Sequence, residues 1–137
     1  VMLNDYILIR EFVGLSKKDR FKELNDLGDE AASKLQSSLE MAVKQYKNIL
    51  CLTHVPPFRE SCWHEGGISD DNYLPHFACK AVGDVLRTTM QRNPDSYLTV
   101  LCGHTHSSGK VQILENFEVI TGEAEYGKPK IQRVIYL

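Results

Sequence analysis

Residues 97–106 read Tyr97-Leu98-Thr99-Val100-Leu101-Cys102-Gly103-His104-Thr105-His106. The apolar first part predicts a buried strand, and two histidines follow directly after its end. Side chains two residues apart on extended backbone face the same way and lie roughly 6.5–7 Å apart. Histidines at this spacing can each ligate a different one of two metal ions held about 3.5–4 Å apart. His104 and His106 are therefore candidate metal ligands.

A second apolar run ends in a histidine in the same way. It covers residues 48–53, and His54 follows it. Its continuous apolar character is typical of a strand covered on both faces. A helix predicted over 75–91, with Pro75 in its first turn, connects the two runs. These three elements predict a β-α-β unit with parallel strands, so His54 and His104 are expected at one edge of the sheet, close enough to share an ion.

The whole chain, residues 1–137, is interpreted as a single α/β domain. Ser16 is a candidate N-cap for a long amphipathic helix that reaches about Tyr46, with a potential break at Gly28. A long surface loop is expected over 56–74, and loops of this length are usually functional or mobile. The other predicted strands cover residues 6–9, 111–114, 117–121 and 131–136, the last three antiparallel.

Composition narrows the class of protein. Hydrophobic residues make up 42% of the 137 residues and charged residues 25%, which is typical of a globular protein. A net charge of −2 gives no electrostatic reason to expect nucleic acid or an anionic membrane as a partner. No apolar stretch approaches the length that spans a bilayer. Four cysteines without CxxC pairing are interpreted as reduced thiols of a cytoplasmic protein rather than as a disulfide framework.

The histidines and one cysteine admit two interpretations. A lone histidine at a strand end is more often hydrogen-bonded than metal-bound, but three at matched positions favour a metal site. Cys102, His104 and His106 are spaced two residues apart, so on extended backbone their side chains would all face the same way. A mononuclear zinc site that includes its thiolate is therefore an alternative to its burial as a small hydrophobe.

The long loop carries further candidates. His64 and His76 flank it and are candidate substrate-binding residues or proton donors, or else exposed loop histidines. The triplet Cys62-Trp63-His64 suggests either a capping element over the metal site or an aromatic packing anchor.

At the histidine blocks the chain resembles the calcineurin-like metallophosphoesterase family. Residues 52–57, Leu-Thr-His-Val-Pro-Pro, are similar to the family's penultimate metal block, and residues 103–106, Gly-His-Thr-His, to its last block. The resemblance implies a four-layered α/β/β/α sandwich whose second sheet holds the closing antiparallel strands. It also implies two divalent or trivalent ions (iron, manganese, zinc or similar), with His54 and His104 on one ion and His106 on the other.

The family's earlier blocks are absent from this sequence. They are an Asp-x-His, a Gly-Asp-x-x-Asp that supplies a bridging carboxylate, and a Gly-Asn-His-Asp/Glu. Gly28-Asp29-Glu30 lies in a predicted helix and is not followed by the second aspartate, so it is no substitute. Histidines alone do not supply the negative charge and bridging oxygen that hold two divalent ions close together. The chain therefore resembles the C-terminal half of a metallophosphoesterase domain, and the N-terminal half is its expected partner.

The function implied by the resemblance is metal-dependent hydrolysis of a phosphoester, as a phosphatase or phosphodiesterase. The isolated chain is expected to be inactive. The alternative is a non-catalytic scaffold of the same fold that binds protein partners and holds metal weakly. An exposed sheet edge would favour pairing of the chain with itself or with another chain.

Overall fold

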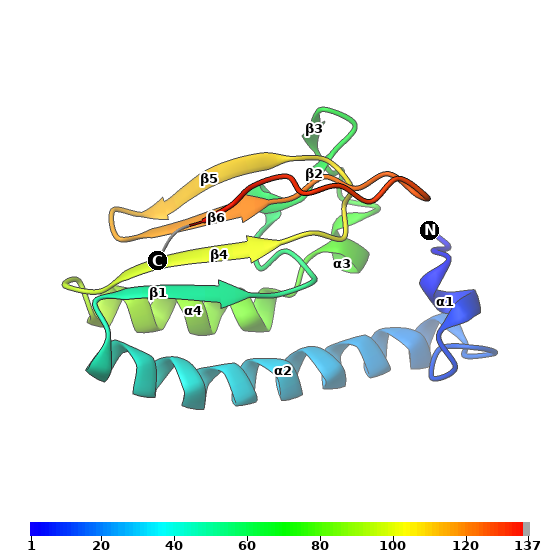
Figure 1. The fold of residues 1–137 in the computed structure, drawn as a ribbon. Helices are drawn as coiled ribbons and strands as arrows, with labels where there is room; N and C mark the ends of the chain where they lie inside the picture. The colour runs from blue at the N-terminus through cyan, green and yellow to red at the C-terminus, as the bar shows by residue number, and fades with distance from the viewer. Residues whose placement is uncertain (136–137) are drawn as a thin grey trace.

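The computed structural model describes residues 1–135, and its centre is a four-stranded sheet (Figure 1). The strand order is β1-β4-β6-β5. β4 pairs in parallel with both β1 and β6, whereas β5 and β6 are antiparallel. The predicted parallel β-α-β unit is thus confirmed, within a mixed α/β fold. The strand bounds are β1 Asn48–Leu52, β4 Tyr97–Cys102, β5 Gly109–Leu114 and β6 Phe117–Thr121.

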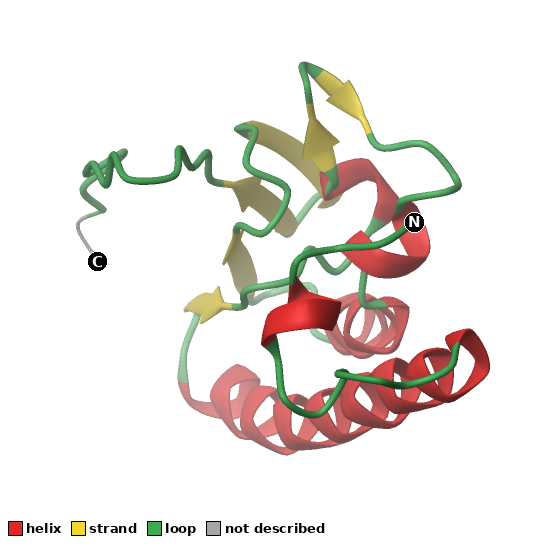
Figure 2. Cartoon of the chain, turned by 90° about the vertical axis from the view of Figure 1, so that its right-hand side faces the viewer, coloured by secondary structure: helices red, strands yellow, loops and turns green. Residues whose placement is uncertain are grey.

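Two long helices pack against each other on one side of the sheet, as Figures 1 and 2 show. Between β1 and β4 the chain also forms a 3-10 turn and a small hairpin, β2–β3. Within residues 1–135, no helix is both long and apolar enough to cross a membrane. The helix bounds are α1 Asp5–Leu8, α2 Lys17–Gln45, α3 Leu74–Phe77 and α4 Lys80–Arg92; the 3-10 turn η1 is Arg59–Ser61, β2 is Trp63–His64 and β3 is Gly67–Ile68.

Helix α2 begins where the sequence predicts. The side-chain oxygen of Ser16 accepts a hydrogen bond of 3.2 Å from the backbone N–H of Asp19, which satisfies one of the free amides of the first turn. The helix continues through Gly28 without a break. The small and aliphatic residues on one face of α2 pack against the core formed by α4 and the sheet. They are Ala32, Leu35, Leu39 and Val43.

The core lies between α4 and the sheet. Leu86 and Met90 of α4 have no exposed surface, and they pack with Val100 of β4 and Val119 of β6. Phe117, at the start of β6, is 1% exposed and contacts the ring of Phe58 at a centroid distance of 5.7 Å. Burial of each side chain of this size stabilises the fold by about 1.5–3 kcal/mol. The packing of α4 on the sheet therefore fixes the strands that carry the histidines.

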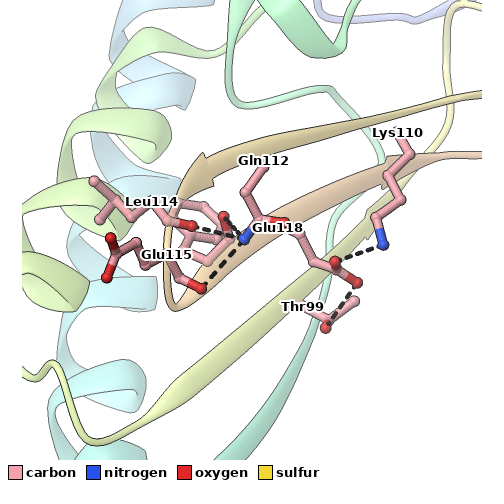
Figure 3. Close-up of polar contacts among 7 residues, drawn as sticks. Thr99, Lys110, Gln112, Leu114, Glu115 and Glu118 are labelled. Carbon is pink, nitrogen blue, oxygen red and sulfur yellow. Dashed lines mark hydrogen bonds and ion pairs between the residues drawn. The ribbon is translucent and has the colours of Figure 1, made fainter.

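The other face of the sheet is partly polar, and none of the helices within residues 1–135 covers it (Figure 1). Lys110 and Glu118 form an ion pair of 2.7 Å there, and the hydroxyl of Thr99 donates to the same carboxylate (Figure 3). Leu52 is 73% exposed. The prediction that residues 48–53 are covered on both faces is therefore wrong, because only the face with Cys51 turns into the core.

The C-terminal segment was predicted to add a strand over 131–136, and this is wrong for residues 131–135. They form neither helix nor strand and are exposed, with Ile131 at 87%. Apolar alternation stabilises a strand only where a neighbouring strand can pair with it. Tyr136 lies outside the described residues. The predicted strands at 111–114 and 117–121 are confirmed as parts of β5 and β6, but they extend the sheet of β1 and β4 rather than forming a second one.

Two further predictions near the site are wrong. Residues 6–9 do not form a strand: the first three belong to the short helix α1, and Ile9 directly follows it. A short apolar run is compatible with either a buried strand or a buried helix, so the sequence alone did not distinguish them. Tyr6 is the buried residue of this helix. The helix predicted over 75–91 is two helices, since the backbone is extended at Ala78 and Cys79. The Cys79 N–H donates to the carbonyl of Pro56 instead of continuing the helix. Pro75 does occupy the first turn of α3, as predicted.

Candidate metal centre

His54 and His104 lie side by side at the carboxyl ends of two parallel strands. Leu52 pairs with Leu101 in the sheet, and the Gly103 N–H donates to the His54 carbonyl at 3.0 Å, which extends the pairing past the strand ends. The two rings then meet edge to face, with centroids 5.0 Å apart. Nδ1 of His104 is 3.2 Å from Nε2 of His54. The predicted approach of these two histidines is thus present in the structure.

This nitrogen-to-nitrogen separation suits one shared ion. Two imidazole nitrogens, each about 2.0–2.1 Å from a metal and about 90–110° apart as seen from it, lie about 2.9–3.4 Å from each other. In the absence of metal the same separation allows a hydrogen bond between the rings. A shared ion would lie to one side of the line between the two nitrogens, so both rings would have to turn toward it.

The tautomer of His104 follows from its second nitrogen. Nε2 of His104 lies 3.2 Å from the backbone carbonyl of His76. A carbonyl only accepts, so Nε2 carries the proton and Nδ1 presents its lone pair toward His54. Metal-binding histidines generally donate their other N–H to such a carbonyl or to a carboxylate. Burial lowers the pKa of His104, against an opposing effect of the carbonyl contact, and this favours the neutral ring that a metal requires.

The loop after β4 is not extended, so the predicted side-by-side placement of His104 and His106 is wrong. Both residues have left-handed backbone, with φ of 68° and 65°. Non-glycine residues in this region are strained and cluster at functional sites. The ring of His106 instead contacts that of Tyr126 at a centroid distance of 4.9 Å. Across residues 1–135 no three His, Cys, Asp or Glu side chains gather as a metal-binding group.

The hairpin β2–β3 holds this strained loop. Nδ1 of His64 lies 3.1 Å from the Thr105 carbonyl, and the N–H of Glu65 donates to the Ser107 hydroxyl at 3.1 Å. Trp63 packs so closely on Gly109 that a Cβ there would lie 2.1 Å from the indole nitrogen. Residues 62–64 therefore form a packing anchor on the loop that carries His104 and His106. A substrate contact by His64 stays a prediction, with Nδ1 engaged by the loop.

The alternative that His76 is an exposed loop histidine is wrong. Its side chain is neither fully exposed nor free: Nδ1 is hydrogen-bonded to the hydroxyl of Tyr6, and its ring packs against Tyr6 and Phe21, each at a centroid distance of 5.5 Å. Burial lowers the pKa of His76. Its backbone, not its side chain, touches His104. A substrate contact by His76 stays a prediction. Tyr6 and Phe21 carry no motif, so no sequence signal could have linked them to the site.

The cysteines do not take part in the histidine cluster. All four are free thiols, and Cys102 is buried, with its sulfur 3.4 Å from the Thr121 hydroxyl. Burial raises the pKa of the Cys102 thiol, and it raises that of Cys62 to about 12. The Cys102 side chain lies on the core face of β4 together with Leu98 and Val100. The structure therefore favours burial of Cys102 as a small hydrophobe over the mononuclear zinc alternative.

Residues other than the histidines line two hollows on the surface. One, of about 540 Å³, is lined by residues such as Tyr46 and Tyr97 at the opposite end of the strands. The other, of about 740 Å³, lies between the open face of the sheet and residues 130–135. His54, in contrast, is exposed at the surface.

Comparison of the chain with protein-family models, curated proteins and solved structures found no match. A functional proposal therefore depends on the histidine geometry.

Proposed function

We propose that this chain contributes the histidine ligands of a metal-dependent phosphoester hydrolase of the calcineurin-like metallophosphoesterase type. The observation that carries the proposal is the 3.2 Å approach of His54 Nε2 and His104 Nδ1 at the carboxyl edge of parallel strands. The neutral tautomer inferred for His104 supports it. The blocks at 52–57 and 103–106 supply the specific link to phosphoester chemistry.

In this proposal His54 and His104 hold one ion between them, and His106 serves the other. His106 would have to leave Tyr126 to do so. Such ions would supply Lewis-acid activation of water and of the phosphoester. The chain's own contribution is to present neutral imidazoles in fixed orientation. Imidazole suits manganese, iron and zinc, so the residues do not select among them.

The carboxylates that such a site requires would come from an N-terminal half of the same domain. The face of the sheet away from the helices supports this part of the proposal at β1, where Leu52 is 73% exposed. Leu101 and Ile120, on the same face, line the hollow beneath residues 130–135. A second sheet on that face would complete the four-layered sandwich. In the isolated chain, the free edge of β1 would offer a pairing site to a second copy.

Metal affinity of the chain tests the proposal. In a Co²⁺ titration followed by visible absorption, His54→Ala and His104→Ala should each abolish the imidazole-bound spectrum. His64→Asn is the matched control, since an amide can still donate to the Thr105 carbonyl, and it should bind Co²⁺ as the unmodified chain does. Equal binding in all variants would contradict a shared ion.

The non-catalytic scaffold remains the second candidate, favoured by the position of His106 away from the pair. The full protein, loaded with Mn²⁺, separates the two. The hydrolase proposal requires cleavage of p-nitrophenyl phosphate or bis-p-nitrophenyl phosphate that is lost in His104→Ala. Absence of cleavage of both, with metal still bound at His54 and His104, would favour the scaffold.

A further inference from the structure

We propose that Tyr6 is a positioning residue for the metal site, acting through His76 to fix the ring orientation and tautomer of His104. This inference rests on the proposed function in one respect only, namely that the His54 and His104 pair binds metal. The contacts run in series from the surface helix α1 to the site. The Tyr6 hydroxyl bonds Nδ1 of His76, and the His76 carbonyl lies 3.2 Å from Nε2 of His104.

Tyr6 is buried, although its neighbours in α1 are exposed. It is 4% exposed, whereas its neighbours Ile7 and Leu8 are 62% and 79% exposed. The guanidinium carbon of Arg20 lies 4.3 Å from the centre of its ring, and Phe12 contacts the ring edge at a centroid distance of 5.6 Å. A cation over an aromatic face adds about 0.5–2 kcal/mol. The hydroxyl is therefore fixed at His76 by contacts on several sides of its ring.

The His76 carbonyl needs such support because of its position. Helix α3 has four residues and ends at Phe77, and the backbone is extended at Ala78. Carbonyls in the last turn of a helix have no partner within that helix. The His76 carbonyl is thus available to His104, but a four-residue helix does not hold it rigidly by itself. The Tyr6 hydroxyl and the ring of Phe21 both contact the ring of His76. Because these contacts hold the His76 side chain, they also hold its backbone carbonyl, which faces His104.

The consequence is a measurable coupling between α1 and metal affinity. Loss of a direct hydrogen-bond partner of a metal-binding histidine typically weakens binding by 10–100-fold. Tyr6 acts one residue further away, so Tyr6→Phe should weaken Zn²⁺ binding by about 3–10-fold. Without the hydroxyl, His104 should also populate both neutral tautomers instead of the Nε2–H form alone. Tyr97→Phe removes a hydroxyl at the opposite end of the sheet and should change neither property.

The experiment combines two readouts on the folded chain at pH 8. Long-range ¹⁵N–¹H spectra report the His104 tautomer without metal, and calorimetry reports Zn²⁺ affinity. His76→Leu is a second variant, and a Tyr6→Phe/His76→Leu double variant should show no loss beyond the single ones, as expected for residues in series. A wild-type tautomer in both Tyr6→Phe and His76→Leu would overturn the inference. If the unmodified chain bound no Zn²⁺, the proposed function would fail, while the tautomer would still decide the role of Tyr6.

Discussion

Replacement of Gly83 by alanine tests how helix α4 fixes the segment that follows His54. Gly83 is buried in α4, and a Cβ at this position would lie 2.2 Å from the carbonyl oxygen of Pro57. It would also lie 3.0 Å from the ring of Phe58. The ring can turn, but the carbonyl belongs to the backbone of the His54 segment. Helix and segment must therefore separate.

The size of the effect follows from two opposing contributions. Alanine is better than glycine in a helix by about 1 kcal/mol. A carbon-to-oxygen contact needs about 3.3 Å, so the backbone must move by about 1 Å. Overpacking that shifts backbone costs about 3 kcal/mol, the upper end of the usual range. Gly83→Ala should therefore lower the free energy of unfolding by about 2 kcal/mol.

Gly28→Ala in α2 is the matched control. Its Cβ would lie 3.3 Å from the sulfur of Cys79, a side-chain atom that can yield by a few tenths of an ångström. The helix propensity gain is the same, so this variant should be neutral or slightly stabilised. Urea unfolding followed by circular dichroism compares the two. If Gly83→Ala were as stable as Gly28→Ala, the close packing of α4 on the Pro57 carbonyl would be refuted.

Three other predictions concern the hairpin, a thiol and the core. Gly109→Ala should displace Trp63, the sole tryptophan, and shift its fluorescence to longer wavelength; an unchanged spectrum would exclude the close contact. Burial raises the pKa of Cys62 to about 12, so unfolding exposes a thiol that ionises more readily. Stability should then fall between pH 9 and 12 by up to about 1.4 kcal/mol per pH unit, and Cys62→Ala should reduce this slope in urea titrations. Leu86→Ala should cost about 2–5 kcal/mol, whereas Leu52→Ala, at a position 73% exposed, should cost far less; similar midpoints would argue against the assigned core.

The sequence was sufficient for the elements whose signal is local. Parallel pairing of β1 and β4 follows from two apolar runs joined by a helical segment, and the meeting of His54 and His104 follows from that pairing. The Ser16 cap likewise lies within one turn of its partner Asp19.

What could not be predicted depends on contacts between distant residues. Tyr6 and His76 are 70 positions apart, and no local pattern in the sequence marks the contact between them. The left-handed backbone at His104 and His106 was missed because the extended spacing rule assumes that the strand continues. It does not continue, since the loop is held by His64 and its hairpin.

The most direct test of the account is a Zn²⁺ titration of the chain, followed by imidazole ¹⁵N chemical shifts. A shared ion predicts that Nε2 of His54 and Nδ1 of His104 change together and saturate at the same Zn²⁺ concentration. The nitrogens of His64 should not change with them. If only one of the two histidines responded, or if neither did, the claim that this pair forms a metal centre would be contradicted.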